Sequence, residues 1–140
     1  MNKQIAAWQD DVLSPVDKLE VHKKGLKHPA VSVFVKRNNE ILLQQRAACK
    51  YHSPNLWANT VCTHPHWEES SYTCAIRRLE EELNIKSLDL KFCKEIEYKA
   101  DVRDMSRAGP ARRYNELKYN FSAKSVLFQI CLDGLYVREY

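Results

Sequence analysis

The sequence predicts an α+β domain in which one central helix packs on a mixed or antiparallel β-sheet. Residues 71–83 carry apolar side chains at helical spacing, and segments rich in β-branched and aromatic residues lie on both sides of them. The chain has 140 residues, of which 44% are hydrophobic and 29% are charged. This length and composition fit a single folded domain over residues 1–140.

Composition and charge also limit the classes of function. The N-terminus lacks the apolar core of a signal peptide, and no apolar run approaches the roughly 18 residues of a membrane helix. We therefore expect a cytoplasmic protein without a membrane partner. Five cysteines without paired spacing indicate reduced thiols. A net charge of +4, spread along the chain, favours a small anionic ligand over nucleic acid, and we expect a monomer.

The N-terminal part gives weak signals. Residues 1–17 are polar and mixed, so we expect a loosely packed arm with a turn or a helix start at Ser14-Pro15. Residues 18–27 are basic and interrupted by Gly25, which argues against a firm helix.

The segments before the central helix are predicted to form strands. Residues 30–36 and 40–45 are rich in β-branched and apolar residues, and the polar residues 37–39 between them predict a β-hairpin. Residues 46–55 break the pattern and predict a loop. A short strand is expected over 56–62.

The central helix is predicted over residues 71–83. The hydroxyl of Ser70 or Ser71 can cap its start, and Asn84 can adopt the left-handed conformation at its end. One face is apolar and the other is charged. The apolar face consists of Ala75, Ile76, Leu79 and Leu83.

The C-terminal third is predicted to return to strands. Residues 99–113 contain Gly109-Pro110 and little periodicity, which indicates a long loop. Asp133-Gly134 is typical of a two-residue hairpin turn. Strands are expected over 90–98, 115–121 and 125–132.

Cysteine and histidine side chains offer a candidate site. Cys62 and His64 are two residues apart, so in a strand both would emerge on one face. His22 and His28 could join His64 and a carboxylate around zinc or another divalent transition metal. The alternatives are an inert buried cysteine and solvated histidines.

A structural zinc site is a further alternative, because five potential ligands lie close together in the sequence. Their spacing does not fit the paired patterns of such sites. These residues are Cys49, His52, Cys62, His64 and His66.

The charged residues of the helix allow two interpretations. Arg77/Glu81 and Arg78/Glu82 are i,i+4 pairs of the kind that line a solvated helix face. Alternatively, carboxylates could converge on Mg2+ together with substrate phosphate oxygens, the candidates being Glu69, Glu81 and Glu82. Basic side chains that could hold a phosphate flank these elements at Lys18, Arg46 and Lys50.

Residues 63–85 resemble the Nudix box, a conserved pattern of glycine, glutamate and arginine with a final Glu-Glu pair. The matching residues are Glu69, Arg77, Leu79, Glu81, Glu82 and Ile85, while Thr63, Arg78 and Asn84 stand where the box has Gly, Glu and Gly. The pattern W-x-N-x-V-C-x-H-P over 57–65 is similar to the type I isopentenyl-diphosphate isomerases of the Nudix superfamily. Segments 17–35 and 42–47 are similar to the same family.

This resemblance implies a Nudix-like fold with a central catalytic helix. It also implies an enzyme of isoprenoid biosynthesis that interconverts isopentenyl diphosphate and dimethylallyl diphosphate by protonation and deprotonation. Cys62 would be one proton-transfer group and Glu116 the other, with Tyr98 assisting Glu116.

The resemblance further implies two metal sites and a small-molecule diphosphate substrate. A second divalent metal, which could be Mn2+, Mg2+ or Zn2+, would be bound by His22, His28, His64 and Glu116. Mg2+ would accompany the diphosphate and bind Glu82. Basic residues around the diphosphate would be Lys18, Arg46, Lys50 and Arg78.

The tail departs from the family pattern. The family has a Glu-Asn-Glu segment, whereas this chain has Tyr114 before Asn115 and Glu116, and residues 101–140 read as a diverged or truncated tail. Two other functions therefore stay open. One is a Nudix-type pyrophosphohydrolase using Glu69, Glu81 and Glu82, and the other is an impaired remnant that binds metal or diphosphate.

Overall fold

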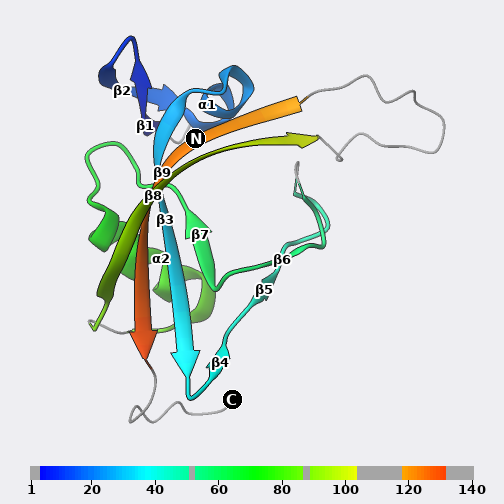
Figure 1. Cartoon of the computed structure of the whole chain (residues 1–140), viewed down its shortest axis with the longest axis vertical. Coiled ribbons are helices and arrows are strands. Elements are labelled where there is room, and N and C mark those ends of the chain that lie inside the picture. The colour runs from blue at the N-terminus through cyan, green and yellow to red at the C-terminus, as the bar shows by residue number, and fades with distance from the viewer. Residues whose placement is uncertain (1–3, 51–52, 87–88, 104–117, 132–140) are drawn as a thin grey trace, which may run out of the picture.

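A computed structural model describes residues 4–50, 53–86, 89–103 and 118–131. Its main sheet has the strand order β4-β3-β9-β8, with β7 also paired to β3 (Figure 1). The hairpin β1–β2 and helix α1 lie at one end of this sheet, and α2 lies against one of its faces. The elements are β1 (Gln4–Gln9), β2 (Val12–Asp17), α1 (Lys18–Lys24), β3 (Lys27–Arg37), β4 (Glu40–Ile41), β5 (Gln44–Gln45), β6 (Trp57–Ala58), β7 (Val61–Thr63), α2 (Ser71–Leu83), β8 (Lys91–Arg103) and β9 (Lys118–Cys131).

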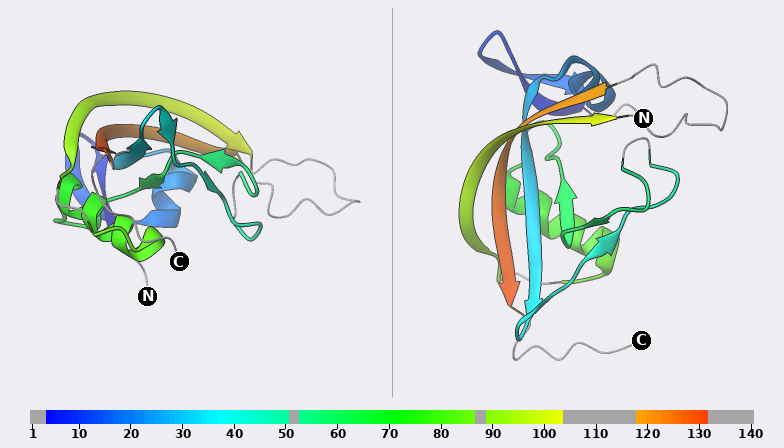
Figure 2. Two further views of the ribbon diagram at one scale, coloured as in Figure 1. Left: turned by 90° about the horizontal axis from the view of Figure 1, so that it is seen from below. Right: turned by 45° about the vertical axis from the view of Figure 1, so that its right-hand side comes forward.

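The main sheet is mixed, as predicted. Strand β9 runs parallel to β3 and antiparallel to β8, and β7 is antiparallel to β3. The long strands β8 and β9 curve together around the helix side of the molecule (Figure 2). The predicted α+β class is confirmed.

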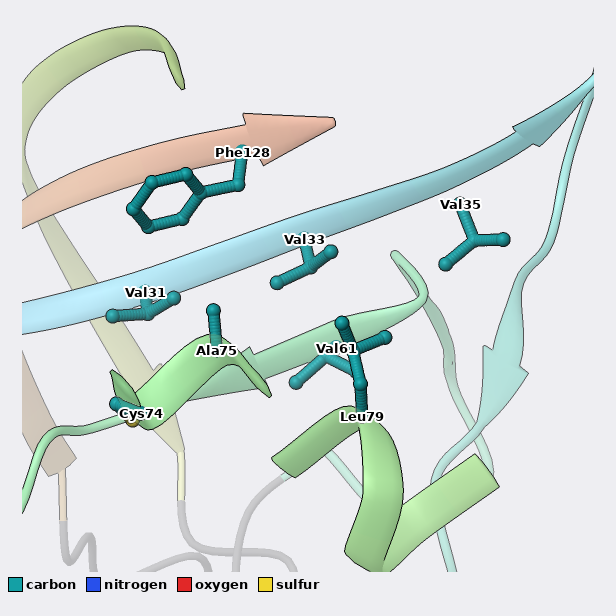
Figure 3. Packing of buried hydrophobic residues seen from close by; sticks show 8 residues of the cluster. All are labelled: Val31, Val33, Val35, Val61, Cys74, Ala75, Leu79 and Phe128. Carbon is teal, nitrogen blue, oxygen red and sulfur yellow. The ribbon is translucent and has the colours of Figure 1, made fainter. Parts of the chain in front are cut away.

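Residue alternation along β3 separates the core from the opposite face of the sheet. Val31, Val33 and Val35 are at most 1% exposed and point toward α2 (Figure 3). They pack with Val61, Cys74, Ala75, Leu79 and Phe128. Because successive strand residues point to opposite faces, His28 and Ser32 belong to the other face.

Helix α2 begins and ends where the sequence predicts. The Ser70 hydroxyl accepts a hydrogen bond from the Thr73 amide at 3.0 Å, and Asn84 ends the helix with φ 52° in the left-handed region. Cys74, Ala75 and Leu79 form its buried face.

The N-terminal segment is a hairpin, so the expectation of a loosely packed arm is wrong for the described residues of this segment. The turn lies at Asp10 and Asp11, both with positive φ, and not at Ser14-Pro15, which lie within β2. Side chains of β1 and β2 are buried and form a second apolar cluster that holds the hairpin to the domain. This cluster contains Ile5, Ala7, Val16 and Val21.

Residues 18–24 form a helix, so the prediction that this segment does not form a firm helix is wrong. The Asp17 carboxylate accepts hydrogen bonds from the Leu19 and Glu20 amides at 3.0 and 3.2 Å, which satisfies the first turn. Gly25 has φ 63° and therefore ends the helix as a C-cap, where we had expected it to prevent one. Burial of His22 on the inner side of α1 follows from this geometry.

Strand β3 is longer than the predicted 30–36, whereas the strands between β3 and α2 are shorter than predicted. The β3–β4 hairpin turns at Asn38 with φ 52°, but β4 has two residues and β5 is separate from it. The strand expected over 56–62 is divided into two. Strand β6 ends at Ala58 and β7 begins at Val61, and the buried Thr60 lies between them. The loop expected over 46–55 is confirmed for its described residues.

The strands after α2 are longer than predicted. Strand β8 extends to Arg103, so the start of the loop expected over 99–113 is strand. One strand, β9, occupies the region where two were expected. The rest of that loop and the turn at Asp133-Gly134 lie outside the described residues.

Two further expectations concern thiols and membranes. Among the described residues, Cys49, Cys62, Cys74 and Cys93 are free thiols. Within the same part of the chain, no helix is long and apolar enough to cross a membrane.

Leu79→Ala should lower the free energy of unfolding by about 2–5 kcal/mol, because it opens a cavity between α2 and the sheet. Chemical denaturation of the two proteins measures the difference. Leu56→Ala is the matched control, since Leu56 is 58% exposed and its truncation leaves the core intact. Equal losses in the two variants would contradict the assigned core.

Candidate active site and metal centre

Three histidines from separate elements meet at one end of the sheet. His22 lies on α1, His28 on β3, and His64 directly after β7. Ligand atoms of the three rings lie within 4.8 Å of one another, and His22 and His28 are fully buried. The structure therefore brings together the three histidines that the sequence suggested as metal ligands.

Hydrogen bonds orient two of these rings. Nδ1 of His28 lies 2.8 Å from the Leu26 carbonyl oxygen, which can only accept, so the ring proton belongs on Nδ1. His64 forms a hydrogen bond with the Pro29 backbone. This contact raises the pKa of His64 and so opposes burial, which lowers it. The buried atoms Nε2 of His28 and Nδ1 of His64 have no hydrogen-bond partner among the described residues. Unpaired buried nitrogens facing a common centre fit a metal site.

Burial also keeps two of these imidazoles, those of His28 and His64, neutral. Desolvation lowers the pKa of His28, and it lowers the pKa of His64 well below its usual 6.5 with help from the neighbouring rings and Lys18. Neutral imidazole is the form that binds a metal. Three imidazole ligands suit zinc or another divalent transition metal. Within the described part of the chain, the group that could hold a metal includes neither Cys49 nor Cys62.

Cys62 lies on β7, directly opposite Ser32 of β3. The Ser32 hydroxyl lies 4.0 Å from the Cys62 Sγ and can donate to it. Although the residue is exposed, desolvation raises the pKa of the thiol, so Cys62 holds its proton at neutral pH. His64 follows two residues later, close to the same face of the sheet.

Tyr98 completes this face from β8. It pairs in register with Ala123 of β9, which in turn pairs with His28. Burial raises the pKa of the Tyr98 phenol, and the negative charge of an ionised Cys62 raises it further. The two side chains are thus close enough to influence one another.

Two of the predicted phosphate-binding residues lie near Cys62. Lys18 begins α1 and Arg46 follows β5, and both favour the charged form of the Cys62 thiol. Arg46 is further held by donation from its Nε to the Ser53 carbonyl oxygen at 3.2 Å. Lys50 lies exposed in the loop between β5 and β6.

The charged face of α2 is salt-bridged, as one of the two interpretations predicted. Arg77 and Arg78 both bond Glu81, at 3.1 and 2.7 Å, and Arg78 also pairs with Glu82. The second Glu82 oxygen accepts a hydrogen bond from Gln44 at 2.8 Å. Glu82 is close enough to Cys62 to raise the pKa of its thiol.

Glu69 has a structural role. Arg77 donates to both of its carboxylate oxygens at 2.6 and 2.8 Å, and the His66 amide donates at 2.9 Å. These contacts hold the pKa of Glu69 at about 2 and fix the turn that precedes α2. A carboxylate that is held through both oxygens by one guanidinium, with a backbone amide as a third donor, is poorly available to a metal.

Three residues of the site region were not anticipated from the sequence. Ser32 faces Cys62, Gln44 bonds Glu82, and Thr60 is buried between β3 and the chain at Leu42. Among the three, only Ser32 gave a usable signal, because it is a polar residue within the apolar run 30–35. Glu116 and Tyr114 lie outside the described residues, so their predicted roles stay untested.

Comparisons with known proteins show the family to which the chain belongs. The family model described as NUDIX domain matches residues 26–126. A protein of Rhodobacter capsulatus named isopentenyl-diphosphate Delta-isomerase is 58% identical over 102 residues, which cover 73% of this chain and 58% of that protein. One of the same name from Ruegeria pomeroyi is 62% identical over 98 residues, or 70% of this chain and 54% of that protein. The chain thus spans a little over half the length of these relatives.

Among solved structures, a C. elegans Ap4A hydrolase aligns with a TM-score of 0.46 and 19% identity, over 79% of this chain and 74% of that one. A likeness of this size adds nothing to the family match.

The histidine cluster should bind one Co2+ ion per chain, visible as a d–d absorption band. His64→Ala should abolish the band, because it removes one of three converging nitrogens. His66→Ala is the matched control, since His66 lies two residues away and outside the cluster. An unchanged band in His64→Ala would contradict the assigned ligands.

Glu69→Gln should weaken the protein at neutral pH but not in acid. The folded pKa of about 2 lies below the usual 4.5, so the ion pair is fully stabilising above about pH 4.5 and is lost as the pH falls toward 2. We expect a loss of about 2 kcal/mol in the free energy of unfolding at pH 7, shrinking steadily in acid. Urea unfolding measures it, with the exposed neighbour variant Glu68→Gln as control. A penalty that does not depend on pH would contradict the pairing.

Proposed function

Because the chain belongs to the Nudix family, and because its site joins a protonated thiol to a buried histidine cluster, we propose that it interconverts isopentenyl diphosphate and dimethylallyl diphosphate. The observation that carries this proposal is the position of Cys62 beside that cluster, with Tyr98 near its thiol. The names of the similar proteins support it. The enzyme would act in isoprenoid biosynthesis, in the cytoplasm and as a monomer.

The reaction needs two proton-transfer groups. A proton is added to the terminal carbon of the alkene, which gives a tertiary carbocation. A proton is then removed from the CH2 group next to the cationic carbon, on the side of the diphosphate, and the electrons of that C–H bond form the new double bond. Cys62 serves as one of the two groups, and its raised pKa means that it carries a proton in the resting enzyme. Glu116 is the proposed second group, on the opposite side of the hydrocarbon.

Tyr98 assists the proton transfer. Its raised pKa keeps the phenol protonated, so it can donate a hydrogen bond to a carboxylate that gains or loses a proton. Its closeness to Cys62 supports a role between the two proton-transfer groups.

The diphosphate binds to basic residues and to Mg2+. Lys18 and Arg46, both near Cys62, would hold the phosphate oxygens together with Lys50 and Arg78. Glu82 would bind the Mg2+ that accompanies the diphosphate, since Mg2+ combines a few carboxylates with phosphate oxygens.

His22, His28, His64 and Glu116 would hold the second metal, which could be Mn2+, Mg2+ or Zn2+. Its charge would favour the ionised form of a neighbouring carboxylate. The chain itself supplies the imidazoles, and burial keeps those of His28 and His64 free of a competing proton.

A pyrophosphohydrolase using Glu69, Glu81 and Glu82 has less support. Glu69 is bonded through both oxygens to Arg77, and Glu81 is bonded by both Arg77 and Arg78. Arg78 also stands where the Nudix box has glutamate.

Purified protein with Mg2+ should convert isopentenyl diphosphate into dimethylallyl diphosphate. Cys62→Ala should lower the rate by at least about a hundredfold, because it removes a proton-transfer group. Mass spectrometry or NMR of the product measures it, and Cys93→Ala, an exposed cysteine away from the site, is the control. Equal turnover in wild type and Cys62→Ala would remove Cys62 from the mechanism. Phosphate release without isomerisation would favour the hydrolase.

A further inference from the structure

Gln44 connects the helix carboxylate Glu82 to the backbone beside Cys62. Its side-chain nitrogen donates to Oε2 of Glu82 at 2.8 Å and also to the Thr60 carbonyl oxygen. Gln44 lies on β5, two residues before Arg46, and is partly buried. One amide group therefore joins α2 to the segment that leads into β7.

The other end of this connection is firmly anchored. Thr60 is fully buried, and its hydroxyl accepts from the Val35 amide at 2.9 Å and donates to the Leu42 carbonyl oxygen at 2.5 Å. Thr60 is thus fixed to β3, the strand that carries His28. A donor bonded to the Thr60 carbonyl has little freedom to move.

Arg78 and Gln44 act differently on Glu82. Arg78 pairs with Oε1 and brings positive charge, whereas Gln44 bonds Oε2 as a neutral donor. A neutral hydrogen bond orients a carboxylate without offsetting the negative charge that attracts a cation. Removing a residue that hydrogen-bonds a metal ligand commonly lowers the metal affinity by about 10–100-fold.

We propose that Gln44 is a positioning residue that holds the Glu82 carboxylate ready for the divalent cation bound with the diphosphate. This inference rests on the proposed role of Glu82 as the Mg2+ ligand. It assigns to Gln44 a share of the Mg2+ affinity and no part in proton transfer.

The test is calorimetric titration of the whole chain with inorganic pyrophosphate at several Mg2+ concentrations. Gln44→Met keeps the side-chain length and removes the donor. At low Mg2+ it should weaken pyrophosphate binding by at least about tenfold, and high Mg2+ should restore the wild-type affinity. Gln45→Met is the matched control, because Gln45 bonds the Asn55 carbonyl oxygen and not Glu82, and it should bind as the wild type does. A purely structural role would not give this rescue by Mg2+.

Glu82→Gln completes the design. If Gln44 acts through Glu82, the double variant should bind no more weakly than Glu82→Gln alone. Wild-type binding in Gln44→Met with weak binding in Glu82→Gln would overturn the inference, and so would unchanged binding in Glu82→Gln. Gln44→Glu, which has the same shape but a carboxylate facing Glu82, replaces Gln44→Met if the latter does not fold. Binding needs no turnover, so a chain without isomerase activity would refute the proposed function and leave this result intact.

Discussion

The two-residue alternation of β3 is the constraint on which the rest of the structure depends. Its valines face α2 and form the core, so the residues between them must face the other way. Those residues include His28 and Ser32, which meet His64 and Cys62 through the antiparallel β7. A shift of one residue in this pairing would bury the site residues under α2 and expose the valines. Stability and site geometry are therefore set by the same register.

Local signals explain what could be predicted from the sequence. Helix α2 has a cap at each end and a regular apolar face, so its bounds follow from residues within it. The hairpin β1–β2 was missed because few of its side chains are buried and its Asp10-Asp11 turn lacks glycine. Gly25 led to a wrong prediction for a different reason. In the sequence, a glycine that ends a short helix cannot be told from a glycine that prevents a helix from forming.

The candidate site contains contacts that local sequence signals do not predict. The histidines, Cys62 and Tyr98 could be named from the family pattern, because each belongs to a recognisable motif. The contacts of Gln44 and Ser32 could not, since they depend on how distant segments meet. The pairing of Glu69 with Arg77 spans eight residues and needs the turn before α2 to bring the two together. Spacing within a helix predicts pairs three or four apart and says nothing of such a contact.

One physical cause dominates the pKa shifts of four residues of the candidate site. Desolvation disfavours whichever form of a group is charged, so it lowers the pKa of His28 and His64 and raises the pKa of Cys62 and Tyr98. The directions are opposite because imidazole gains charge on protonation, whereas a thiol or phenol gains charge on losing its proton. The same burial thus leaves His28 and His64 with free lone pairs and Cys62 with a proton. The proposed metal site and the proposed proton-transfer group can therefore share one face of the sheet, because burial alone gives each of them the protonation state that it needs.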